Sequence, residues 1–383
     1  MRKLWPAMIV ATLGTVGWTN AMAQFPQEGP TLSRKVRNLG MGNVGVALRG
    51  THDSSPFYNP AGLNDLEKGR FQFFSMTGDV STGAVGLIGD ITDFADNIQN
   101  TDGADRTRVF DQFIQDHTGE FNHVRWTLDI FNYARKDFAA GVLIDEKMNV
   151  SFRDQSFPRF EIQNLGDLGM YIAGSHGFWD QLLQVGATLK PTIRFAIDEV
   201  DQEVTYSDIV SENSSGDPIL IDQFKKIKDR RFGLGVDVGA KTNLAFPGIK
   251  GSKMYEILKP QVGVSWQDMG SPGFDAAPNN EQSISAGAAV HPDIWKLKNA
   301  IAVDFRDLNQ ERDFLTKLHF GVESKFPWIL TARAGLSQGY FTLGATFDLW
   351  FVKIDGAWYK EEVGVRTREA GDNRWAATLS FNI

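Results

Sequence analysis

The stretch from Leu39 to Asn64 reads LGMGNVGVALRGTHDSSPFYNPAGLN, and the interpretation of the whole chain depends on it. Its Gly40, Gly42 and Gly45 have the spacing G-x-G-x-x-G of a turn that cradles a phosphate at the start of a helix. Such a turn follows an apolar strand, whereas residues 34–38 are mostly charged and polar, and no alternation of strands and helices follows. The glycines instead predict a backbone that turns and packs tightly inside an enclosed space.

The first residues have the pattern of a secretory signal peptide. Arg2 and Lys3 precede a mostly apolar run over residues 4–18, and residues 21–23 read Ala-Met-Ala, a small-residue cleavage site. We expect a signal peptide over residues 1–23 and a mature chain that begins at Gln24. The alternative, a short membrane anchor, is disfavoured because the apolar run is short.

Length and composition limit the class of protein. The 383 residues fit one large barrel as well as two soluble domains, and the lack of cysteine excludes disulfides and thiolate metal sites. Charged residues make up 22% of the chain, and no internal stretch has the roughly 18 consecutive apolar residues of a membrane helix. The formal net charge of −8 argues against a nucleic-acid partner, whose phosphates need a basic face.

From Arg70 onward, apolar and polar residues alternate with a period of two. Phe341 and Leu343, for example, alternate with Thr342 and Gly344, which places the two sets on opposite faces of a strand. Such runs occupy 70–90, 121–134, 137–148, 166–178, 184–203, 232–239, 256–267, 281–291, 299–307, 315–325, 330–337, 341–349, 351–359 and 373–383. About fourteen strands, an even number, predict an all-β, transmembrane antiparallel barrel over residues 70–383.

The connections between these runs alternate in length. With 70–90 as one long strand, they are long at 91–120, 149–165 and 204–229, and short at 135–136 and 179–183. Long outer loops and short periplasmic turns are typical of outer-membrane barrels. Apolar residues at helical spacing also predict helical parts in 91–117 and 219–230, which would cover the barrel mouth or receive a hydrophobic substrate.

A soluble β-sandwich or secreted barrel is the alternative fold, with its apolar face turned inward. The polar face carries more charged side chains than a dry core would bury unpaired. Aromatic residues also lie near strand ends, where a membrane barrel places its interfacial girdles. These are Trp266, Trp328, Trp350, Trp358 and Trp375.

The predicted lumen face carries charges of both signs. The residues on it are Arg125, Arg194, Asp237, Asp304, Arg306, Lys317, His319, Glu323, Arg333, Asp348, Lys353 and Asp355. The simpler interpretation is a solvated, mutually paired interior that holds the N-terminal segment. The alternative is that Arg194, Arg306, Lys317 or Arg333 binds the carboxylate of an amphipathic substrate. We place Arg333 first, because a guanidinium fixed on a strand is a rigid bidentate donor.

The sequence offers no catalytic residues, metal site or cofactor motif. No G-x-S-x-G elbow is present, and no serine is clearly matched with a histidine and an acid. The histidines show no metal-ligand spacing. They are His52, His117, His123, His176, His291 and His319. An enzyme is therefore the less favoured interpretation.

Asn59-Pro60-Ala61, preceded by the Gly-Met-Gly of residues 40–42, resembles a motif of the FadL-type outer-membrane channels and their PorV-like relatives. The resemblance covers residues 37–63 and the general strand pattern, with weaker similarity around 333–340. It implies an N-terminal plug in the barrel lumen, here residues 24–69. The plug residues it carries over are Gly40, Gly42, Gly45, Asn59, Pro60 and Ala61.

The resemblance implies passive uptake of hydrophobic small molecules, such as long-chain fatty acids, across the outer membrane of a Gram-negative bacterium. The expected partners are outer-membrane lipid, the substrate and the barrel-insertion machinery. PorV-like relatives imply the alternative, a barrel that does not transport and serves as a docking or shuttle component for secreted proteins. One departure is the final Ile383, where such barrels usually end in an aromatic residue.

Overall fold

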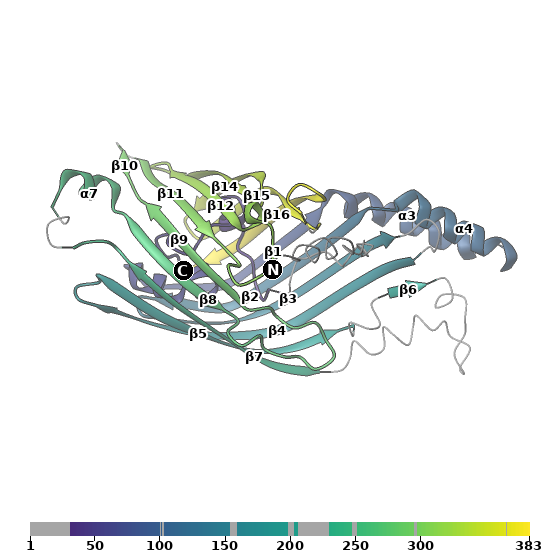
Figure 1. Cartoon of the computed structure of the whole chain (residues 1–383), viewed down its shortest axis with the longest axis horizontal. Coiled ribbons are helices and arrows are strands. Elements are labelled where there is room, and N and C mark those ends of the chain that lie inside the picture. Colours follow the sequence, from purple (N-terminus) through teal and green to yellow (C-terminus); the bar gives the residue numbers. More distant parts are fainter. Residues whose placement is uncertain are drawn as a thin grey trace, which may run out of the picture.

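A computed structural model describes residues 31–99, 101, 103–153, 159–197, 203–205, 230–246, 251–294, 297–364 and 366–383. The predicted signal peptide and its cleavage site lie outside the described residues. The described chain forms a barrel of long antiparallel strands with a short N-terminal segment inside it (Figure 1).

The sheet contains sixteen strands, of which fourteen close the barrel and two, β6 and β10, attach to its edges. Each barrel strand pairs antiparallel with the next, β16 pairs with β1, and β9 pairs with β11. The barrel strands are β1 (Arg70–Ser81), β2 (Phe121–Arg135), β3 (Phe138–Arg153), β4 (Arg159–Phe178), β5 (Leu183–Ala196), β7 (Arg231–Thr242), β8 (Gln261–Gln267), β9 (Ser283–Val290), β11 (Leu297–Phe305), β12 (Leu318–Lys325), β13 (Leu330–Ser337), β14 (Tyr340–Leu349), β15 (Val352–Glu362) and β16 (Gly371–Asn382). The small strands are β6 (Glu203–Thr205) and β10 (Asp293–Ile294). The predicted fourteen-stranded antiparallel barrel is confirmed.

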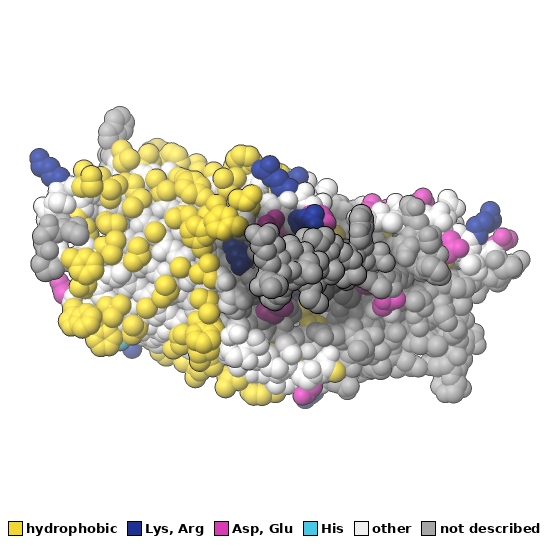
Figure 2. All heavy atoms as spheres, viewed as in Figure 1, with side chains coloured by type: hydrophobic (Ala, Val, Ile, Leu, Met, Phe, Trp, Pro, Cys, Tyr) yellow, Lys and Arg dark blue, Asp and Glu magenta, His cyan; other side chains and the backbone are white. Residues whose placement is uncertain are grey.

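The apolar face of the strands points outward, as the alternation predicts. On β14, Phe341 has 70% of its surface exposed, whereas the neighbouring Thr342 is 1% exposed and faces the lumen. The outward side chains form a broad apolar band over the part of the barrel away from α3 and α4 (Figure 2). The soluble sandwich is excluded, because the sheet closes on itself and its apolar face is the outer one.

The two ends of the barrel differ in their connections. At one end, called here the turn end, β1 begins and β16 ends, and short connections span residues 136–137, 326–329 and 350–351. At the other, the loop end, the helices α3 (Thr82–Gln99) and α4 (Gly103–His117) extend beyond the barrel (Figure 1). The loop-end connection 306–317 contains the short helix α8 (Phe314–Lys317).

Several predicted boundaries were wrong. The run 70–90 is not one strand, because β1 ends at Ser81 and α3 begins at Thr82. Much of the predicted loop 149–165 is strand, since β3 and β4 continue as a paired hairpin in which Arg153 lies opposite Arg159. The first residues of 256–267 and 315–325 belong to helices α7 (Lys253–Leu258) and α8.

Helical structure in 91–117 is confirmed by α3 and α4. The predicted helical segment 219–230 lies outside the described residues, apart from Arg230. None of the helices in the described ranges is long and apolar enough to cross a membrane.

The luminal segment, defined here as residues 31–69, runs inside the barrel and contains three short helices. They are α1 (Val36–Leu39), α2 (Ser55–Tyr58) and η1 (Pro60–Asp65). Its apolar side chains pack on small inward-facing residues of the wall, as Met41 and Val44 do on Ala289 and Ala302. Larger wall residues, Leu143 and Tyr171, pack with Phe57 and Leu63 of the segment, while many other inward side chains are polar.

Candidate functional site

The luminal segment packs with its backbone directly against the barrel wall. A Cβ atom added to Gly40 would lie 2.8 Å from the Cα of Gly344 on β14. Gly42 has φ +68°, and a Cβ there would lie 2.1 Å from the carbonyl oxygen of Phe320. At Gly45 the added atom would meet the ring of Tyr58 at 2.3 Å. Each glycine of the G-x-G-x-x-G stretch thus has a steric reason to lack a side chain.

Glycines of the wall complete this close fit. Six strands each place one glycine where an added Cβ would lie within 2.9 Å of an atom of the luminal segment. They are Gly186, Gly239, Gly263, Gly321, Gly335 and Gly344. A glycine inside a strand marks a close approach by another backbone, so this belt of glycines fixes where the segment crosses the lumen.

Asn59 joins the luminal segment to two strands of the wall. Its Nδ2 lies 2.8 Å from the carbonyl oxygen of Val46, 3.3 Å from that of Ala240 on β7 and 3.2 Å from that of Val264 on β8. Its Oδ1 accepts a hydrogen bond from the backbone N–H of Ala61 at the start of η1. Asn59 is 3% exposed, so these hydrogen bonds take the place of the ones that both polar atoms of its side chain would make with water.

Asp304 of β11 binds the backbone of the glycine stretch. Its Oδ2 accepts hydrogen bonds from the backbone N–H groups of Gly45, at 2.6 Å, and Val46, at 2.9 Å. Nearby, the N–H of Gly42 donates to Thr342 Oγ1 at 2.9 Å, and its carbonyl oxygen lies 2.9 Å from Nδ1 of His319. These wall residues satisfy backbone groups that a turn with no regular structure leaves unpaired.

Ion pairs fasten the luminal segment to strands around the barrel. The pairs are Arg34 with Glu361, Lys35 with Asp129, Arg37 with Glu323, Asp53 with Lys353, and Asp65 with Lys241. Burial alone would raise the pKa of Asp53, but Lys353 and Lys35 outweigh it and hold this pKa well below the ordinary value. The sequence predicted the inward position of Glu323 and Lys353 but not that of Asp129, Lys241 or Glu361.

The four predicted substrate-binding candidates do not form one site. Arg194 is fully buried and binds Asp167 on β4 through two nitrogens. Arg306, just after β11, donates to the carbonyl oxygen of Asn43 at 3.0 Å, and its Cζ lies 5.2 Å from the ring centroid of Tyr58. Lys317 ends α8 at the loop end, where its Nζ donates to the carbonyl oxygen of Gln310.

Arg333, the first-ranked candidate, lies near the turn end of the lumen. It donates to Glu323 at 2.6 Å and to Thr346 Oγ1 at 2.6 Å, and a longer contact of 3.6 Å joins it to Asp355. It lines a cavity of about 440 Å³ between the luminal segment and strands β12–β15. Its Nε and one of its terminal nitrogens therefore already have acceptors.

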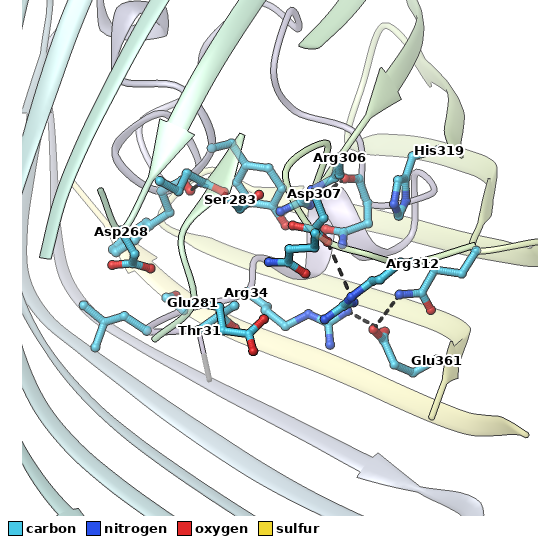
Figure 3. A pocket seen from close by; sticks show the side chains of 18 of the residues that line it. Thr31, Arg34, Asp268, Glu281, Ser283, Arg306, Asp307, Arg312, His319 and Glu361 are labelled. Atoms are coloured by element: carbon cyan, nitrogen blue, oxygen red, sulfur yellow. Dashed lines mark hydrogen bonds and ion pairs between the residues drawn. The ribbon is translucent and has the colours of Figure 1, made fainter. Parts of the chain in front are cut away.

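On the loop-end side of the luminal segment is a second cavity, of about 110 Å³ (Figure 3). Its walls carry paired charges: Arg34 binds Glu361 at 2.6 Å, and Arg312 lies 3.8 Å from Asp307. Of the four candidates, Arg306 lines this cavity. We call it the outer cavity, and its lining is mainly polar and charged.

Lys190 is a lumen charge that the sequence reasoning missed. Its Nζ lies 2.8 Å from an oxygen of Asp237 and 2.8 Å from one of Asp268, and all three side chains are nearly inaccessible to solvent. Lys190 lies on the inward face of β5, as do Thr188 and Arg194, which are both buried. Period-two alternation across 188–194 was the signal that could have identified it.

Comparison with known proteins gives the fold. No protein-family model matches the sequence, and no curated protein matches it. Among solved structures, the deltaS2 mutant of the TodX monoaromatic hydrocarbon channel matches with a TM-score of 0.50 and 13% identity, over 91% of this chain and 98% of that one.

Two further structures match less closely. The P. putida toluene transporter TodX has a TM-score of 0.46 and 13% identity, over 93% of this chain and 98% of that one. A Pseudomonas aeruginosa FadL homologue has a TM-score of 0.42 and 12% identity, over 92% and 98%. At 13% identity the match to the deltaS2 mutant of TodX concerns the fold alone, and this chain shares the fold of that structure, a closed barrel.

Proposed function

We propose that this protein is an outer-membrane barrel for the passive movement of hydrophobic small molecules. The observation that carries the proposal is the closed fourteen-stranded barrel, apolar outside, whose lumen is crossed by a segment fastened to the wall. Its fold is that of a structure named as a monoaromatic hydrocarbon channel, which supports the proposal. In this arrangement residues 31–69 act as a plug, and the turn end faces the periplasm.

The helical hairpin of α3 and α4 is the proposed landing site for substrate. Leu87 of α3, Phe110 and Ile114 of α4, and Phe152 of β3 form a buried apolar cluster outside the barrel proper. A hydrophobic molecule that separates these side chains exchanges one apolar surface for another, so it enters without a large desolvation cost. From there it reaches the loop end of the lumen and the outer cavity.

A long-chain fatty acid is the proposed substrate class, with Arg306 as the partner of its carboxylate. Arg306 lines the outer cavity, ahead of the luminal segment on the inward path. Arg194 and Arg333 would each have to give up a hydrogen-bonded carboxylate to bind the substrate. The hydrogen bond of Arg306 goes to a neutral carbonyl oxygen, and Asp304 and Asp307 act on Arg306 without a hydrogen bond to it. A charge-assisted bond to an incoming carboxylate therefore costs less at Arg306.

The second candidate function is a docking or shuttle barrel for secreted proteins. The small polar outer cavity and the ion pairs that cross the lumen favour it, because a hydrophobic solute gains little from such a lining. For transport, the luminal segment must therefore shift, and the ion pairs of Arg34 and Lys35 near its described start are the contacts we expect to break.

Uptake measurements separate these functions. Labelled long-chain fatty acid and labelled toluene are supplied to cells that lack such channels, with and without the folded barrel. We expect uptake of both, a severalfold lower uptake of fatty acid with Arg306→Gln, and unchanged toluene uptake. Lys317→Gln is the matched control, since Lys317 does not line the outer cavity. No uptake of either compound by a folded barrel would favour the docking function.

A further inference from the structure

The connection between β7 and β8 differs from the other turn-end connections. It spans residues 243–260, whereas the connections between β2 and β3 and between β14 and β15 span residues 136–137 and 350–351. Within it, α7 leaves Met254 71% exposed and Ile257 55% exposed. Two large apolar side chains thus point away from the protein in a connection that could have been much shorter.

The helix is held rigidly on the barrel. Ser252 caps its start by accepting a hydrogen bond from the N–H of Tyr255, and Lys259 ends it in the left-handed conformation. The Tyr255 hydroxyl donates to the carbonyl oxygen of Asn243 at 3.0 Å, and the N–H of His291 donates to that of Leu258 at 2.7 Å. A helix of six residues is not stable alone, so these contacts form it and fix its orientation.

The helix has three distinct faces at 100° per residue. Tyr255 and Leu258 are partly buried and turn toward the barrel, while Lys253 and Glu256 are exposed and lie together on a polar face. Met254 and Ile257 lie between these two faces, one turn apart. This is the arrangement of a helix that lies in the plane of an interface, with one side in lipid and one in water.

Exposed tryptophans of other turn-end connections support a position of this helix at the membrane surface. Trp328 is 89% exposed in the turn after β12, and Trp350 is 91% exposed in the turn after β14. Ile294 of β10, which follows the His291 contact, is also exposed. Tryptophan side chains at such positions sit at the headgroup level, and the outward apolar band reaches this end of the molecule (Figure 2).

We propose that α7 is an in-plane anchor that binds phospholipid of the periplasmic leaflet, with Met254 and Ile257 inserted beneath the headgroups. The occupant is lipid rather than protein because Met254 and Ile257 lie at the same end of the barrel as the exposed Trp328 and Trp350, where the outward apolar band ends. The proposal depends on the membrane orientation of the barrel and not on what, if anything, the lumen transports.

The lack of cysteine makes a direct test possible. Met254→Cys, Ile257→Cys and Glu256→Cys are each labelled with a nitroxide in the full mature chain, folded into vesicles of phosphatidylethanolamine and phosphatidylglycerol. For each label, the rate of collision with oxygen, which concentrates in lipid, is compared with the rate of collision with a water-soluble nickel chelate. Heat-dependent gel migration confirms that each variant is folded.

We expect labels at 254 and 257 to collide severalfold more with oxygen and severalfold less with the nickel chelate than the label at 256. Equal access of the chelate to all three positions would overturn the proposal, because the helix would then stand in water. Low access of both reagents at 254 and 257 would also overturn it, since a protein, such as a second copy, would then cover the face.

Discussion

Gly40 of the luminal segment and Gly344 of β14 lie backbone against backbone, so that a Cβ on either would lie within 2.9 Å of the other's Cα. Two chain segments more than three hundred positions apart therefore share a contact that no side chain could enter. The fit is purely steric, and it can be tested without changing any charge.

Gly344→Val is expected to destabilise the folded barrel by about 1–3 kcal/mol, the usual cost of overpacking a tight site. The matched control is Gly356→Val on the adjacent strand β15, where an added Cβ would meet nothing within 4 Å. Denaturant unfolding in detergent micelles measures both. Equal stability of the two variants would show that the luminal segment yields to the added side chain without loss of a favourable contact.

Asn59 gives a second test, based on polarity. Its Nδ2 faces three carbonyl oxygens, so Asn59→Ala removes donors from buried acceptors and should cost about 1–3 kcal/mol. Asn59→Asp should cost more, because it turns a carboxylate oxygen toward the same carbonyl oxygens. Unfolding in denaturant measures both variants, and we expect the midpoint of Asn59→Asp to be the lower one. An Asn59→Asp variant as stable as wild type would contradict the hydrogen-bond assignment.

The barrel could be predicted from the sequence because lipid and lumen impose opposite demands on alternate residues. Thr342 and Phe341 show this directly, and the same rule would have placed Lys190. The rule failed at Thr82, because the apolar residues that follow pack in a helical hairpin that extends beyond the barrel, where alternation is not required. It failed again at 149–165, where β3 and β4 stay paired beyond the apolar band.

The site was less predictable for a different reason. The pairs Lys35–Asp129 and Asp53–Lys353 join residues about one hundred and three hundred positions apart, and they exist only once the luminal segment has its path across the lumen. A single sequence shows which residues face inward but not which of them meet. The four basic candidates were therefore predicted as a group, although Arg333 lies near the turn end and the other three lie toward the loop end with different partners.

We expect His117, at the end of α4, to make the helical hairpin sensitive to pH. Burial lowers the pKa of His117, but the carbonyl oxygen of Phe113 and the carboxylate of Asp90, with Glu120 nearby, more than offset this and raise it above the ordinary value. The charged form therefore stabilises the folded hairpin at pH values below about 6.5, and this contribution is lost as the pH rises through the raised pKa.

We expect trypsin to cleave α4 at the exposed Arg108 faster at pH 8 than at pH 6, after correction for the activity of trypsin on a peptide. Asp90→Asn removes the charged partner on α3 and should reduce the difference between the two pH values. A corrected pH difference that is the same in Asp90→Asn and in wild type would show that the pair of His117 and Asp90 does not hold the hairpin closed.

We expect the luminal segment itself to close the barrel. Deleting residues 40–63 removes the backbone that the wall glycines accommodate, the groups that bind Asp304, and the Asp53 partner of Lys353, while Lys241 keeps Asp65. The freed charges then face water in an open lumen, so we expect a folded barrel with a large increase in conductance in planar bilayers. Arg37→Gln is the milder variant, which loses one ion pair with Glu323 and should leave the conductance low. A deletion variant that is folded and still impermeable would mean that the long loops, and not the luminal segment, close the pore.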